Sequence, residues 1–172
     1  MPRLISVILG ITVHQRGPDE LPSSPFLALL LLFASELAQL VALRLTAVPD
    51  GIVMLMLCAV ALDFLFVWTV LAVFERQQRF WQTMNAVLGA GIVLNAISAL
   101  LVAWNESLHS AANATTVPEV LIRILQVWSV DIGGFVLSRA IDRHYALTVA
   151  IMLGYVLLST SLLSTLLLSA SV

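Results

Sequence analysis

The chain has 172 residues, of which 60% are hydrophobic and 10% are charged, with a formal net charge of −2 and a mean hydropathy of +1.04. About a quarter of the residues of a soluble domain are charged, so this composition excludes an ordinary soluble globular protein. It predicts an integral membrane protein built as one helical bundle, with no room for a sizeable aqueous module.

Residues 1–24 are predicted to form an N-terminal helix and a linker. The stretch 2–13 is apolar but too short to cross a bilayer, and Arg3, Ser6, Gly10 and His14 form a narrow polar side. This pattern favours an interfacial helix on the cytoplasmic leaflet, and a terminal segment packed on the bundle is the alternative. The linker that follows contains three prolines and a glycine, so it cannot be helical throughout.

Residues 25–172 are predicted to form the transmembrane domain. Ser24 before Pro25 has the composition of a helix N-cap, and Thr116 with Pro118 and Glu119 starts another helix. The fold class we predict is all-α, a bundle of five transmembrane helices preceded by the interfacial amphipathic helix. The five predicted spans are 25–45, 52–74, 83–104, 118–141 and 146–168.

The distribution of arginine predicts the orientation of the chain. With the N-terminus in the cytoplasm, six of the eight arginines lie inside, whereas Arg44 and Arg123 lie outside. The positive-inside rule therefore predicts a cytoplasmic N-terminus and a periplasmic C-terminus. All eight basic residues are arginine, and leucine and alanine are abundant, which favours a bacterial inner-membrane protein.

The fourth span is unusually polar, because it contains Arg123, Gln126 and Asp131 before Gly134. Arg123, Asp131 and Gly134 are spaced by multiples of a helical turn, so they fall on one side of the helix. Charge in hydrocarbon must face protein, water or a partner, and small residues mark close helix contacts. This side of the span is therefore predicted to be an interface.

Four polar residues are predicted to lie in one layer: Glu36, Asp63, Asn95 and Asp131. Each lies about 12 residues into its span, roughly 18 Å along a helix and near the middle of a ~30 Å hydrocarbon core. One interpretation is a proton or cation relay. The other is that these groups hold helices together through hydrogen bonds worth about 0.6 kcal/mol each.

Sequence signatures of catalysis and metal binding are absent. The chain contains no HExxH, GxSxG, P-loop or GxGxxG motif, and its three histidines are widely separated. We therefore expect no enzymatic activity, no cofactor, no metal site and no nucleic-acid partner.

Three features resemble the Yip1-type membrane proteins and their small bacterial relatives. These are Gly17-Pro18 within the RGPDELP segment, the hydropathy of residues 25–168, and the region 128–143. The resemblance implies a five-span, non-enzymatic bundle that works by binding other membrane proteins or lipids.

The leading functional expectation is an accessory, assembly or scaffold subunit of a larger membrane complex. Its partners would be other integral membrane proteins and lipids, with a homo-oligomer as a further possibility, and its interface the polar side of the fourth span. The arginine-containing segments 76–79 and 139–143 are candidates for contact with anionic headgroups. The alternative is a proton- or cation-coupled transporter or channel subunit that uses Glu36, Asp63 and Asp131.

Overall fold

The computed structural model describes residues 2–44, 52–108 and 116–170, and every regular element within these ranges is a helix. The predicted turns near residues 46–51 and 109–115 lie outside the described residues. In chain order the elements are α1 (Pro2–Thr12), η1 (Pro18–Glu20), α2 (Pro25–Arg44), α3 (Ile52–Val73), η2 (Gln77–Arg79), α4 (Phe80–Leu108), α5 (Val117–Ile141) and α6 (Tyr145–Ala170).

Four segments of the described chain are long and apolar enough to cross a membrane. They are Ile52–Val73, Gln77–Leu108, Val117–Ile141 and Tyr145–Leu166. The prediction of an all-helical protein is confirmed for the described residues, and the four apolar helices suggest that it is embedded in a membrane. The described side chains of α2 cover Pro25–Leu40, an apolar segment about 24 Å long, which is shorter than a ~30 Å hydrocarbon core.

Local capping signals define where two of the helices begin. The Ser24 hydroxyl oxygen accepts a hydrogen bond from the Leu27 backbone N–H at 3.2 Å, so α2 starts at Pro25 as predicted. Thr116 and Glu119 form a reciprocal capping box at the start of α5, in which the Thr116 backbone N–H donates to Glu119 Oε2 at 3.3 Å. Both starts satisfy backbone donors that a bare helix end leaves unpaired.

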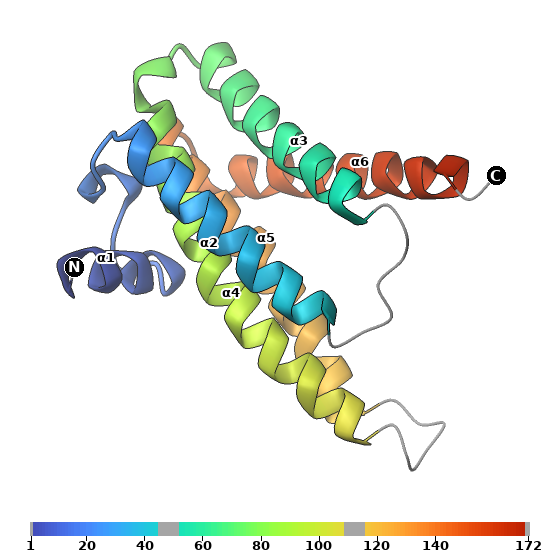
Figure 1. Cartoon of the computed structure of the whole chain (residues 1–172). Helices are drawn as coiled ribbons and strands as arrows, with labels where there is room; N and C mark the ends of the chain where they lie inside the picture. The colour runs from blue at the N-terminus through green and yellow to red at the C-terminus, as the bar shows by residue number, and fades with distance from the viewer. Residues whose placement is uncertain (1, 45–51, 109–115, 171–172) are drawn as a thin grey trace.

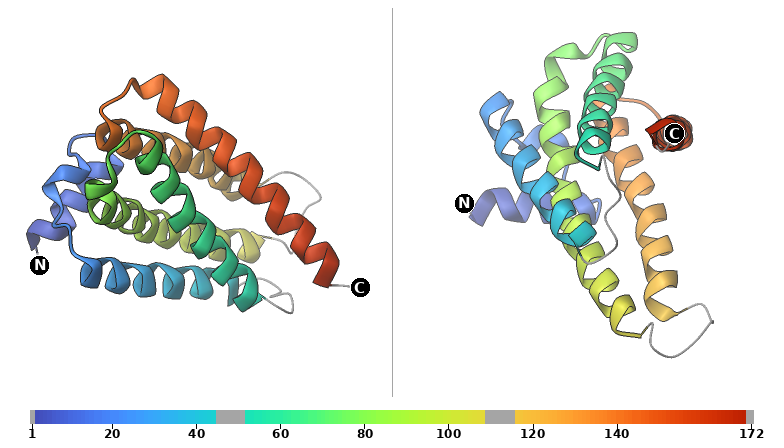
Figure 2. Two further views of the ribbon diagram at one scale, coloured as in Figure 1. Left: turned by 90° about the horizontal axis from the view of Figure 1, so that it is seen from above. Right: turned by 45° about the vertical axis from the view of Figure 1, so that its right-hand side comes forward.

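The longer helices form a layer with two divergent additions (Figure 1). Helices α2, α4 and α5 run side by side, and α4 is the central one because it packs against both of the others. Helix α6 meets α5 near its own start and then diverges from it, and α3 crosses the layer at an angle (Figure 2). The starts of α2, α4 and α6 and the ends of α3 and α5 gather at one end of the bundle, which we call the arginine end for Arg76, Arg79, Arg139 and Arg143.

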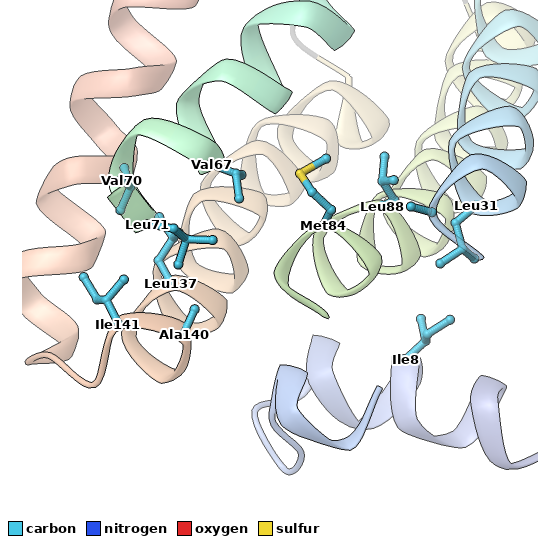
Figure 3. Packing of buried hydrophobic residues seen from close by; sticks show 11 residues of the cluster. Ile8, Leu31, Val67, Val70, Leu71, Met84, Leu88, Leu137, Ala140 and Ile141 are labelled. Atoms are coloured by element: carbon cyan, nitrogen blue, oxygen red, sulfur yellow. The ribbon is translucent and has the colours of Figure 1, made fainter. Parts of the chain in front are cut away.

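Two clusters of apolar side chains form the core. The larger cluster, drawn in Figure 3, contains residues from each of the helices α1, α2, α3, α4 and α5. It consists of Ile8, Ala28, Leu31, Val67, Val70, Leu71, Met84, Leu88, Leu137, Ala140 and Ile141. The smaller one packs one side of α1 on α4 and α5, and consists of Val7, Ile11, Leu21, Ala86, Ala90, Ile132 and Val136. The opposite side of α1 exposes Ile5 and Leu9 together with the polar residues Arg3 and Ser6.

A glycine in α4 allows α1 to approach closely. A Cβ atom built on Gly89 would lie 2.9 Å from Ile8 Cγ1, closer than van der Waals contact permits. The N-terminal linker is held on the same helix by the buried Asn85, whose amide donates to Pro22 O at 2.8 Å and to Ser24 O at 3.3 Å. The N-terminal segment is thus packed on the bundle.

Candidate functional site

A polar cavity of about 150 Å³ lies between α2, α3 and α4. Three of the residues predicted to share a layer, Glu36, Asp63 and Asn95, line it together. The remaining lining residues are Leu32, Ser35, Gln39, Val60, Phe64, Val87, Leu88 and Gly91. The structure therefore brings two carboxyl groups and an amide from three different helices around one small space.

Helical periodicity explains why these polar side chains meet. Ser35 and Gln39 are one turn apart on α2, and Gly91 and Asn95 are one turn apart on α4, so each pair lies on the same side of its helix. The Asn95 amide nitrogen donates to the Ser35 hydroxyl oxygen at 3.4 Å, which links α4 to α2 across the cavity. At ~30 Å³ per water molecule, the cavity has room for several waters or a small hydrated cation.

A fourth helix reaches Asp63 from outside the cavity wall. The Tyr155 hydroxyl group on α6 donates a hydrogen bond to Asp63 Oδ1. The Tyr155 ring stacks on Phe66, with 4.0 Å between ring centroids and 13° between planes. The ring contact holds the Tyr155 hydroxyl group toward α3. Of the two carboxyl groups in the cavity, Asp63 is the one that accepts a hydrogen bond from a described side chain.

Asp131, the fourth member of the predicted layer, lies elsewhere. Its Oδ2 atom is 3.3 Å from Nε2 of His14, and its Oδ1 atom accepts a hydrogen bond from the Tyr145 hydroxyl group. His14 also packs edge-on against the Phe135 ring, with 4.4 Å between centroids. The geometry of this contact is not that of a hydrogen bond, and His14 Nε2 makes no hydrogen bond to any described residue. Asp131 thus ties the end of the N-terminal helix to α5 and α6.

An open groove of about 660 Å³ lies between α5 and α6, and the polar residues predicted to form an interface on the fourth span line it. Arg123, Gln126 and Asp131 line it with Val127, Ser129, Val130, Val149, Leu153, Val156 and Thr160. Arg123 and Gln126 are exposed, and Val127 retains 71% of its accessible surface. The first half of α5 therefore carries polar side chains that the described chain leaves uncovered.

The second half of α5 is covered by α6 at Gly134. A Cβ atom built there would lie 2.6 Å from Val149 Cγ2 and 3.0 Å from Val149 Cα. A Cβ on Gly133 would meet Met152 Cε at 2.8 Å. The close helix contact expected at Gly134 is thus an intramolecular one with α6.

The chemistry of the site is that of proton exchange, ion contact or helix association. Among residues 2–44, 52–108 and 116–170, no three or more His, Cys, Asp or Glu side chains are grouped to hold a metal ion. The carboxyl groups of Glu36 and Asp63 and the cavity beside them are the features that would serve a proton or small cation.

Sequence reasoning missed three residues that contact the predicted carboxyl groups. Tyr155 binds Asp63, and His14 and Tyr145 contact Asp131. Tyrosine is frequent at membrane interfaces, so the residue type of Tyr145 indicated only an interfacial position. A lone tyrosine in an apolar span, such as Tyr155, was the available signal, since its hydroxyl group needs a partner when buried.

Comparison of the chain with known proteins finds no matching protein family, no matching curated protein and no matching solved structure. Its function is therefore inferred from the sequence and from the geometry of the described residues.

Proposed function

We propose that the protein spans a bacterial inner membrane five times, with its N-terminus in the cytoplasm and its C-terminus in the periplasm. The full length of α2, Pro25–Arg44, corresponds to about 30 Å, enough for a fifth span. Helix α1 would lie at the cytoplasmic interface, with Ile5, Leu9 and Val13 toward lipid. The gathering of four arginines at the arginine end supports this orientation.

We propose that the protein acts as a non-enzymatic accessory, assembly or scaffold subunit of a larger membrane complex. The observation that carries this proposal is the uncovered polar side of α5, which we call the α5 interface and define by Arg123, Gln126 and Val127. An arginine that faces hydrocarbon costs up to roughly 2.5–3.5 kcal/mol on insertion scales, the full cost applying at the centre of a span. A transmembrane helix of another protein that offers a carboxyl or amide group to this surface would remove that cost.

Two further features support a partner on the α5 interface. Polar side chains hydrogen-bond across helices within membranes, so Gln126 supplies specificity that an apolar surface lacks. The resemblance to Yip1-type proteins, on Gly17-Pro18 and region 128–143, also implies a bundle that binds other membrane proteins or lipids. A homo-oligomer would cover the same surface and is an outcome that the experiment distinguishes.

The test is purification of the protein at its native level in nanodiscs, with mass spectrometry of the proteins that accompany it. We expect a stoichiometric partner that is lost on Val127→Phe, because the larger side chain obstructs the interface. Val73→Phe is the matched control, since Val73 on α3 is also 71% exposed. A protein that purifies alone or only with copies of itself contradicts the proposal, as does equal loss of the partner with both variants.

The polar cavity favours a second candidate function, a proton- or cation-coupled transporter or channel subunit. Glu36 and Asp63 line it together, and its volume of about 150 Å³ admits water. A relay carboxylate exchanges protons with both sides of the membrane, and Asp63 would be the central one. Asp131 does not line this cavity and contacts His14 and Tyr145 instead, so this candidate mechanism does not include it.

Ion flux into proteoliposomes tests the second candidate. Flux that is present in the wild-type protein and lost in both Glu36→Gln and Asp63→Asn would support transport. Absence of proton, sodium and potassium flux from folded protein would contradict this candidate and leave the subunit proposal standing.

A further inference from the structure

A second open groove, of about 690 Å³, lies at the arginine end of the bundle where α5 ends and α6 begins. It is lined by Phe135, Ser138, Arg139, Asp142, Arg143, His144 and Tyr145. We call it the arginine groove. It is separate from the polar cavity and from the α5 interface, so its role is independent of the proposed function.

Two guanidinium groups in the arginine groove have no carboxylate partner among the described residues. Arg139 lies over the Phe135 ring, 5.5 Å from its centroid, and Arg143 lies over the Phe74 ring at 5.7 Å. Both arginines are exposed. Contact with an aromatic ring holds each guanidinium in place and leaves its N–H donors available.

The carboxylate in the groove is already neutralised by other residues. Asp142 Oδ2 lies 3.2 Å from Nη2 of Arg76 and 3.1 Å from Nη1 of Arg79. Neither of these arginines lines the groove. The positive charges of Arg139 and Arg143 are therefore not offset from within the groove.

The position of the groove indicates which kind of anion it would bind. Ile141 ends one candidate membrane span and Tyr145 begins the next, so the groove lies at the level where helices leave the hydrocarbon core. Tyr145 is an aromatic residue of the type that anchors at headgroup level. Guanidinium groups bind phosphate oxygens in a bidentate manner. The groove is also larger than a free phosphate ion needs, and it has the apolar side chain of Phe135 in its lining.

We infer that the arginine groove binds the phosphate group of an anionic phospholipid through Arg139 and Arg143. The exposed ring of Tyr145, which also lines the groove, lies beside the lipid glycerol group. Neutral phospholipids carry a compensating cation next to their phosphate and bind less well. A lipid bound in the groove would hold the end of α5 and the start of α6 at the membrane surface.

Native mass spectrometry of the detergent-purified protein tests this inference. The probes are phosphatidylglycerol, phosphatidylcholine and the soluble compound glycerol 1-phosphate. We expect retained adducts with phosphatidylglycerol and few with phosphatidylcholine. Each arginine near an anionic surface contributes about a factor of five in affinity, so the double variant Arg139→Gln/Arg143→Gln should weaken phosphatidylglycerol binding roughly 25-fold.

Two further variants make the result specific. Arg3→Gln/Arg16→Gln removes two positive charges from the N-terminal segment, and because neither residue lines the groove, the adducts should stay within about twofold of wild type. Arg139→Lys/Arg143→Lys keeps the charge but loses bidentate contact, so intermediate binding is expected. Thermal unfolding of each variant verifies that it is folded. Equal binding of the two lipids by wild-type protein, an equal loss in the control variant, or glycerol 1-phosphate binding as tightly as the lipid would each overturn the inference.

Discussion

The Tyr155 hydroxyl group on α6 donates a hydrogen bond to the Asp63 carboxylate on α3 and so joins two helices that otherwise diverge from the bundle. Interhelical hydrogen bonds in membranes average about 0.6 kcal/mol and reach about 1.7 kcal/mol. Tyr155→Phe should lower the free energy of unfolding by an amount in this range, because the ring contact with Phe66 is retained. Denaturation by SDS in bicelles measures this change.

A double-mutant cycle isolates the hydrogen bond between Tyr155 and Asp63. Asp63→Ala alone removes the acceptor, and the double variant should lose less stability than the two single variants together. Strict additivity would show that the two side chains do not interact in the membrane.

Gly134 sets the closest approach of α5 and α6. Gly134→Ala places a Cβ atom 2.6 Å from Val149 Cγ2 and 3.0 Å from backbone, so it should destabilise the protein by about 1–3 kcal/mol. Gly154→Ala on α6 is the matched control, because a Cβ atom there has no heavy atom within 4 Å, and it should be neutral or slightly stabilising. Thermal unfolding in detergent compares the two, and an equal effect would contradict the close α5–α6 contact.

Arg79 caps the end of α5 and should contribute more to the stability of the protein than Arg76 does. Its Nη1 atom donates to Arg139 O at 3.1 Å and Ala140 O at 3.0 Å and pairs with Asp142. Arg79→Ala leaves helix-end carbonyls unpaired and should cost about 1–3 kcal/mol. Arg76→Ala removes an exposed ion pair with Asp142 and should cost at most about 1 kcal/mol. A reversed order in thermal unfolding would count against the cap.

Asn85 holds the N-terminal linker on α4. Asn85→Ala leaves the Pro22 carbonyl without its 2.8 Å hydrogen bond, which should cost about 1–3 kcal/mol locally. The linker should then open more often, and trypsin should cleave after Arg16 roughly tenfold faster. Gln78→Ala, at an exposed position in η2, is the control and should leave the cleavage rate unchanged. Unchanged cleavage in Asn85→Ala would mean that the linker is held by other contacts.

Local patterns in the sequence predict the helices well, because their causes are local. The apolar runs set the helix lengths, and Ser24 and Thr116 mark the starts of α2 and α5 through hydrogen bonds within one turn. The joint position of Glu36, Asp63 and Asn95 followed from helix rise alone, since antiparallel neighbours of similar length place their middles together.

The contacts of Asp131 were not predictable in this way. His14 reaches it only because α1 folds back over α4 and α5, and that path depends on Gly89 and the linker contacts of Asn85. The helical spacing placed Asp131 and Gly134 on one side of α5, but it could not say that α6 covers Gly134 while Arg123 stays exposed. Which neighbour covers a helix side is set by tertiary packing, and sequence periodicity carries no information on it.

Photo-crosslinking in native membranes tests the central claim, that another protein covers the α5 interface. A benzoylphenylalanine residue replaces Val127 in one variant and Val73, which is equally exposed on α3, in the other. The proposal predicts one discrete, light-dependent adduct with a different membrane protein at position 127 and none at position 73. Adducts only with lipid or with a second copy of this chain at position 127, or the same protein adduct at both positions, would contradict it.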